Sequence, residues 1–139
     1  NYASDAVCTI RVTSPSPIGP MSLSVYGDAG DLLILDRYTP SALAYGAADG
    51  LPLELLERVH ECLPRPDVAV LLDIPVEESF RRRPVRDNQY ESKRERLEAA
   101  RQVYLDVFAR GGERWRTING CRPVAEITEE IACIVEEVI

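Results

Sequence analysis

Lysine is almost missing from this chain. Lys93 is the one lysine among its 16 basic residues. No Gly-Lys pair occurs in the sequence. The pattern G-x-x-x-x-G-K-[ST], whose backbone amides and lysine cradle phosphate groups, is therefore not present in these residues. Long apolar runs are missing as well, since none approaches the roughly 18 residues of a membrane span. No charged-then-apolar leader opens the sequence, and we expect neither a membrane segment nor secretion.

Paired cysteines and clustered histidines are also missing. The single histidine, His60, has no second histidine and no C-x-x-C pair beside it, so a surface or helix-end role is expected. The four cysteines show no C-x-x-C spacing, and two have apolar neighbours typical of small core residues. Structural thiols are favoured over a disulfide or a zinc site, and a reducing cytoplasm is the simplest location. The cysteines are Cys8, Cys62, Cys121 and Cys133.

The length and net charge of the chain limit its domain number and the kinds of partner it can bind. The 139 residues suit a single domain, 1–139, with a real core. A net charge of −7 argues against a broad nucleic-acid-binding surface. Basic charge is concentrated in one cluster of four arginines, which is either solvated or functional. They are Arg81, Arg82, Arg83 and Arg86.

Four short apolar runs predict strands. Their near-continuous hydrophobicity is typical of strands buried on both faces of a parallel sheet. Two of them end in Asp36 and Asp73, at the edge where open α/β sheets collect ligands. The runs are Val7–Val12, Leu32–Leu35, Val68–Leu72 and Trp115–Ile118.

Helical patterns alternate with these strands and predict a three-layer α/β sandwich with a mostly parallel sheet. The helices are expected at Leu51–Leu63, with Leu55, Leu56 and Val59 on one apolar face, at about Tyr90–Arg110 and after Pro123. Met21–Gly30 has weak periodicity and predicts no strong helix, and Thr13–Pro20 reads as a loop.

Two segments carry residue types suited to phosphate chemistry. In Asp36–Tyr45 (DRYTPSALAY), a strand delivers an aspartate and an arginine together. An arginine can hold phosphate through two parallel hydrogen bonds, although a structural Asp–Arg pair remains an alternative. In Leu72–Glu91, a strand, a helix begun by Pro75 and an arginine-rich loop follow one another. Loops of this kind close over phosphates and supply positive charge.

In combination these motifs resemble the thymidylate kinase family, which belongs to the P-loop nucleoside monophosphate kinases. Asp36–Tyr45 resembles the family stretch D-R-Y-x-x-S-x-x-A-Y. Leu72–Arg83 and Arg101–Leu105 resemble its Leu-Asp-x-Pro strand end and its R-x-x-Y-L helix. The common order and spacing of the motifs make the resemblance specific over about four-fifths of the chain, Gly30–Ile139.

The resemblance implies roles for individual residues. Arg37 would hold the phosphate of the acceptor nucleotide, and Asp36 would support catalysis at the magnesium–phosphate site. Ser41 would line the thymine pocket, and Tyr45 would lie against the deoxyribose. A lid at 81–91 would supply two catalytic arginines and three residues that close over the acceptor: Arg82 and Arg86, with Asp87, Tyr90 and Glu91.

The implied reaction transfers the γ-phosphoryl group of ATP to dTMP with Mg²⁺, a step toward dTTP. The resemblance also implies the P-loop NTPase fold, a homodimer and a cytoplasmic location, with no nucleic-acid or membrane partner. Two alternatives stay open: a catalytically inactive nucleotide- or partner-binding relative, and a kinase of another deoxynucleotide or nucleoside.

The sequence departs from the family pattern at several points, among them the short segment Met21–Gly30 where the family has a helix-rich stretch. Gly46 replaces a residue that is usually polar, and Asp87–Glu91 is one residue longer than the common end of the lid. The phosphate-binding loop would lie upstream of Asn1, so the domain is expected to be incomplete at its N-terminus. We therefore expect these residues alone to be inactive, with a sheet that lacks its central strand.

Overall fold

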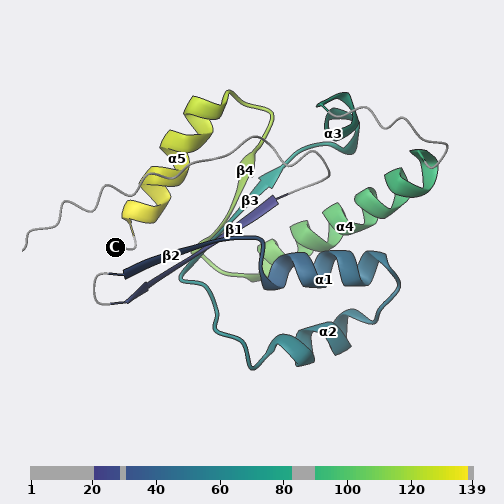
Figure 1. The fold of residues 1–139 in the computed structure, drawn as a ribbon, viewed down its shortest axis with the longest axis horizontal. Helices are drawn as coiled ribbons and strands as arrows, with labels where there is room; N and C mark the ends of the chain where they lie inside the picture. Colours follow the sequence, from purple (N-terminus) through teal and green to yellow (C-terminus); the bar gives the residue numbers. More distant parts are fainter. Residues whose placement is uncertain (1–20, 29–30, 83–89, 138–139) are drawn as a thin grey trace, which may run out of the picture.

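The computed structural model describes residues 21–28, 31–82 and 90–137. These residues form three layers, with the sheet between α1, α2 and α4 on one side and α5 on the other (Figure 1). The strand expected at Val7–Val12 and the loop at Thr13–Pro20 lie outside the described residues. In chain order the elements are β1 (Met21–Asp28), β2 (Asp31–Asp36), α1 (Thr39–Ala48), α2 (Leu53–His60), β3 (Val68–Asp73), α3 (Val76–Arg82), α4 (Tyr90–Arg110), β4 (Trp115–Asn119) and α5 (Val124–Glu136).

The strand order in the sheet is β2-β1-β3-β4. β3 and β4 are parallel, while β1 runs antiparallel to both β2 and β3. Three of the four described strands therefore point the same way, and β1 points the opposite way. The α/β class is confirmed, but the sheet is mixed in its pairing.

The expectation that the sheet lacks a central strand is wrong for the described residues, because β1 fills the position between β2 and β3. The sequence did contain a signal for this strand. Met21, Leu23 and Val25 alternate with Ser22 and Ser24, which is the two-residue period of a strand.

β3 is buried on both faces and connects the two halves of the core. Val68 and Val70 pack with Ile118 of β4 and against α5. Ala69 and Leu71, which point to the opposite face, pack against α1 and α4. Successive side chains on a strand face opposite sides, so a strand covered on both faces must be apolar throughout. This explains the unbroken apolar run in the sequence.

Most of the expected helices are confirmed. α4 spans the predicted residues, α5 begins directly after Pro123, and α3 follows Pro75. The sequence analysis missed α1, although Pro40 lies in its first turn, where proline is well tolerated.

α2 corrects a second expectation, because its predicted apolar face is not buried. Leu55 and Val59 are 52% and 61% exposed. Leu56 instead makes the contact with α1, where a Cβ atom at Gly46 would lie 2.8 Å from its Cδ1 atom. The glycine at position 46 therefore allows α1 and α2 to approach closely.

The cysteines differ from expectation as well. Cys62, Cys121 and Cys133 are exposed free thiols, and Cys8 lies outside the described residues. Cys133 is exposed because it lies on the side of α5 away from the buried Ile131. His60 ends α2, as expected, with Nδ1 2.7 Å from the carbonyl oxygen of Leu56. Of the helices described, none is both long and apolar enough to cross a membrane.

Candidate functional site

The carboxyl ends of β2, β3 and β4 face the same edge of the sheet, because these strands run in one direction. β3 and β4 end side by side, with Asp73 opposite Asn119. β2 ends earlier, since Asp36 is level with Leu23 of β1, which in turn pairs with Val70 of β3. This register places Asp36 and the residues after it beside the central part of the sheet.

Arg37 has an unusual backbone conformation. Its φ angle is 69°, the one positive φ at a non-glycine position in the part of the chain that the structure describes. The left-handed region costs a residue with a Cβ atom roughly 1–2 kcal/mol. Such strain persists where the surrounding structure imposes it, commonly at ligand sites. Here it turns the chain from β2 into α1.

Tyr45 lies further along, within α1, and is the centre of a group of polar side chains. The Cζ atom of Arg37 is 5.4 Å from the centroid of the Tyr45 ring. Arg96 of α4 approaches the same ring, with its Cζ atom 5.3 Å from the centroid. Two residues expected at the site, Arg37 and Tyr45, are thus brought together.

Ser41 belongs to the same group through a buried tyrosine. Its Oγ atom lies 2.5 Å from the hydroxyl oxygen of Tyr104, and either oxygen can donate. Tyr104 is fully buried in the core, and its ring meets that of Tyr45 edge-on at 6.2 Å. Ser41 and Tyr45 of α1 thus both rest on Tyr104 of α4.

At the end of β3, Asp73 is paired rather than open to a ligand. Arg101 donates to both of its carboxylate oxygens, at 2.7 and 2.8 Å. This hydrogen bonding also raises the pKa of Arg101. A cavity of about 440 Å³ lies beside the pair, lined in addition by Pro75, Thr117, Asn119 and Cys121.

Arg82 has two partners at the end of α3. Its Nε atom donates to Glu78 at 2.7 Å, and its Nη2 atom donates to the carbonyl oxygen of Gly120 at 3.0 Å. Arg81 donates to the same carboxylate. Hydrogen bonds from Arg81 and then Arg82 lower the pKa of Glu78 from 4.5 to about 2. Arg82 is therefore held against the loop that leaves β4.

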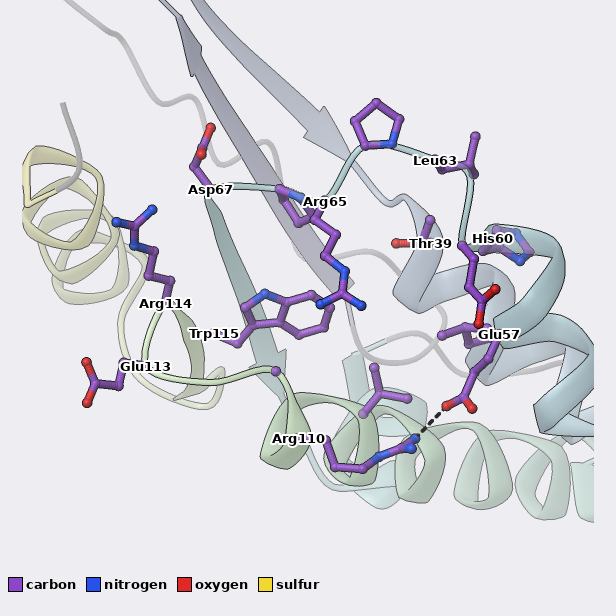
Figure 2. A pocket seen from close by; sticks show the side chains of 16 residues that line it. Thr39, Glu57, His60, Leu63, Arg65, Asp67, Arg110, Glu113, Arg114 and Trp115 are labelled. Atoms are coloured by element: carbon purple, nitrogen blue, oxygen red, sulfur yellow. Dashed lines mark hydrogen bonds and ion pairs between the residues drawn. The ribbon is translucent and has the colours of Figure 1, made fainter.

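A larger cavity of about 600 Å³ lies at the opposite end of the sheet, where β3 and β4 begin (Figure 2). Trp115 lies beside it, Arg65 points toward that ring, and Arg110 pairs with Glu57 at 2.8 Å across one side. None of the residues expected at the site lines this cavity.

The other expected residues are placed less completely. Asp36 is exposed at the end of β2. Tyr90 and Glu91 begin α4, but their side chains are not among those described. Arg86 and Asp87 lie outside the described residues, as does most of the expected lid, 81–91. No three carboxylate, histidine or cysteine side chains group as metal ligands in the described ranges.

The sequence analysis did not assign a site role to Arg96, Asp49 or Tyr104. Tyr104 was expected only as an apolar helix position within the R-x-x-Y-L motif. Position 96 is charged and stands directly before the buried Leu97, which places it beside the packed face of α4. No pattern in the sequence connects Asp49 with Arg96.

Comparison with known proteins points to the same family as the sequence motifs. The family model described as Thymidylate kinase matches residues 25–131. This chain belongs to the thymidylate kinase family. Members of this family have the P-loop NTPase fold, and the α/β arrangement seen here is consistent with it.

Relatives of this thymidylate kinase family member come from archaea and bacteria. A "Probable thymidylate kinase" of Pyrococcus abyssi is 40% identical over 111 residues, which cover 78% of this chain and 54% of the relative. One from Pyrococcus horikoshii is 37% identical over 109 residues, covering 77% and 53%. A "Thymidylate kinase" of Xanthomonas oryzae pv. oryzae is 42% identical over 81 residues, covering 56% and 35%. The chain spans about half the length of the archaeal relatives.

Proposed function

We propose that the protein is a nucleotide kinase that transfers the γ-phosphoryl group of ATP to dTMP and gives dTDP. The observation that carries this proposal is the group formed by Arg37, Ser41 and Tyr45 on α1 and the chain just before it. It offers a guanidinium for a phosphate, an aromatic ring for a sugar and a hydroxyl group for a base edge. A small anionic nucleotide needs these three contacts.

The acceptor nucleotide would occupy the exposed side of this group. Arg37 would bind its phosphate through two parallel hydrogen bonds, and Tyr45 would pack on the deoxyribose and disfavour a 2′-hydroxyl group. Ser41, held by Tyr104, would line the thymine pocket. Reactions of this class depend on positioning and electrostatic stabilisation, with little covalent chemistry from the protein.

The lid, 81–91, would complete the site from the side of α3 and α4. Arg82 and Arg86 would stabilise the negative charge that develops on the transferring group. Asp87, Tyr90 and Glu91 would close over the acceptor. Arg82 already lies against Gly120 in the loop after β4, so α3 holds one lid arginine at this edge of the sheet.

Asp36 fits magnesium in the way this ion usually binds. Mg²⁺ takes one or two carboxylates, several waters and substrate phosphates, so it needs no cage of protein ligands. Asp36 is an exposed carboxylate next to Arg37 and would hold the ion through water. When bound, Mg²⁺ and ATP supply charge neutralisation and the phosphoryl group.

We also propose that the protein acts as a homodimer in the cytoplasm, within dTTP synthesis and without a nucleic-acid or membrane partner. Its 139 residues would form one domain that is inactive alone. The missing Gly-Lys pair supports this last part, since a triphosphate needs amides and a lysine around it. It also favours a second candidate, an inactive relative that binds the nucleotide without turnover.

Two measurements on the protein at its full natural length test the proposal. Titration calorimetry compares dTMP with dUMP, dCMP and dGMP, and a coupled assay follows ADP release with ATP and Mg²⁺. We expect dTMP to bind most tightly and to be phosphorylated. If dTMP binds and no ADP is released, the protein is the inactive, nucleotide-binding relative. If another nucleotide is bound and phosphorylated in preference to dTMP, the protein is a kinase of that nucleotide. Absence of dTMP binding overturns the proposal.

A further inference from the structure

Two arginines from different elements approach one aromatic ring. The guanidinium carbons of Arg37 and Arg96 lie 5.4 and 5.3 Å from the centroid of the Tyr45 ring. A guanidinium within about 6 Å of a ring centroid is attracted by the negative face of the ring. Tyr45 is only half-buried, so part of the ring remains accessible to a ligand. Both cations therefore lie close to a ring that a ligand can reach.

Arg96 is held in this place by Asp49, the residue that follows α1. Its Nε and Nη2 atoms donate to the two carboxylate oxygens at 2.5 and 2.7 Å. These hydrogen bonds lower the pKa of Asp49 and raise that of Arg96, and thus favour the charged form of each group. The paired contact fixes the plane of the guanidinium.

The pair is a weak candidate for a purely stabilising role. The side chains of Arg96 and Asp49 are 48% and 50% exposed. Exposed ion pairs add little to stability, because water and salt screen them. What the pair does provide is geometry. It connects the end of α1 with α4 and holds a cation beside Tyr45. Arg37 reaches the ring from the strained turn before α1.

We propose that Arg96, held by Asp49, is a positioning residue that orients the Tyr45 ring for the sugar of the acceptor nucleotide. This inference rests on the proposed function, in which Tyr45 lies against the deoxyribose. Arg96 acts through Tyr45. Without the cation, the ring gains freedom to move away from the 2′ position, and discrimination against a ribonucleotide falls.

The experiment compares four variants in the protein at its full natural length. Arg96→Ala removes the cation, and Arg96→Lys keeps the charge but loses the two-pronged contact with Asp49. A double variant, Asp49→Arg with Arg96→Asp, restores an ion pair between the helices but moves the guanidinium. Arg94→Ala is the matched control, since Arg94 lies on the same helix and pairs with Glu77 and Glu98. Thermal unfolding establishes that each variant is folded.

Calorimetry then measures the affinity of each variant for dTMP and for ribothymidine 5′-monophosphate. Arg96→Ala is expected to weaken dTMP binding about three- to ten-fold and to reduce the preference for the deoxynucleotide. Arg96→Lys should fall between Arg96→Ala and the wild type, and Arg94→Ala should match the wild type. The double variant should melt like the wild type but should not recover the preference.

Two results would overturn the inference while the proposed function stands. One is a folded Arg96→Ala protein with unchanged affinity and preference. The other is a double variant that regains the preference, because the pair would then only connect the helices. A wild-type protein that does not bind dTMP ends the proposed function and this inference together.

Discussion

Arg101 of α4 donates two hydrogen bonds to the carboxylate of Asp73, the last residue of β3. The side chains are 33% and 20% exposed, so the pair is partly removed from water. It connects the end of β3 to α4, the long helix that also supplies Arg96 and Tyr104. The pair thus fixes α4 on the sheet at the edge where the candidate site lies.

Removal of one partner is therefore expected to be costly. Arg101→Ala leaves the Asp73 carboxylate partly buried without its guanidinium, and should lower the free energy of unfolding by about 1–3 kcal/mol. Urea denaturation followed by circular dichroism measures the change. Arg110→Ala is the control, because Arg110 pairs with Glu57 in a more exposed setting. Equal losses in the two variants would contradict a special role for the Asp73 pair.

Arg37 is expected to decide acceptor binding. Arg37→Ala should weaken dTMP binding by roughly 2–4 kcal/mol, because a charge-assisted contact with the phosphate is lost. ATP affinity should change far less. Titration calorimetry on the protein at its full natural length measures both, with the exposed Arg58→Ala on α2 as the control. Unchanged dTMP affinity in a folded Arg37→Ala protein would refute the assignment.

The lid arginines are expected to act on turnover. Replacing Arg82 and Arg86 together by alanine should lower kcat and leave dTMP binding nearly intact, because they would stabilise charge that develops during transfer. Arg81→Ala is the matched control: Arg81 shares Glu78 with Arg82, but its side chain is 75% exposed. A coupled ADP-release assay reports kcat. Full turnover in the double variant would show that these arginines are not needed for transfer.

Glu78 gives the fold a dependence on acid. Its pKa is lowered from 4.5 to about 2 by hydrogen bonds from Arg81 and Arg82. A carboxylate with a depressed pKa contributes stability that is fully present above the unfolded value and is lost as the pH falls through the folded value. Wild type and Glu78→Gln should therefore differ most in melting temperature above about pH 5 and converge toward about pH 2. Glu129→Gln is the control, because Glu129 is an exposed carboxylate on α5. A constant difference between wild type and Glu78→Gln across this range would contradict the expectation.

The 139 residues, produced alone, are expected to show no phosphoryl transfer. They contain no Gly-Lys pair, and the lid arginines alone would hold a triphosphate weakly against salt screening. The purified chain is incubated with dTMP, ATP and Mg²⁺, and dTDP is measured by chromatography against a sample without protein. Formation of dTDP above that background would mean that these residues contain a different phosphate site.

Much of the framework follows from the sequence alone. β3 is recognisable because a strand covered on both faces must be apolar at every position. α4 and α5 are recognisable by their helical period and by Gly111 and Pro123 at their boundaries. The motif Asp36–Tyr45 and its order relative to the later motifs identify the family, since such patterns are local in the chain.

Only the tertiary structure decided how distant residues pair. The position of β1 depends on hydrogen bonds between strands, which leave no mark in a local period. Helix α2 has the spacing of a buried face, yet burial depends on a neighbour, and among the described elements it packs mainly on α1. Asp49 and Arg96 lie 47 positions apart and meet because α1 and α4 pack together. Family membership was therefore predictable from short motifs in the sequence, whereas the contacts between distant residues arise only when the chain has folded.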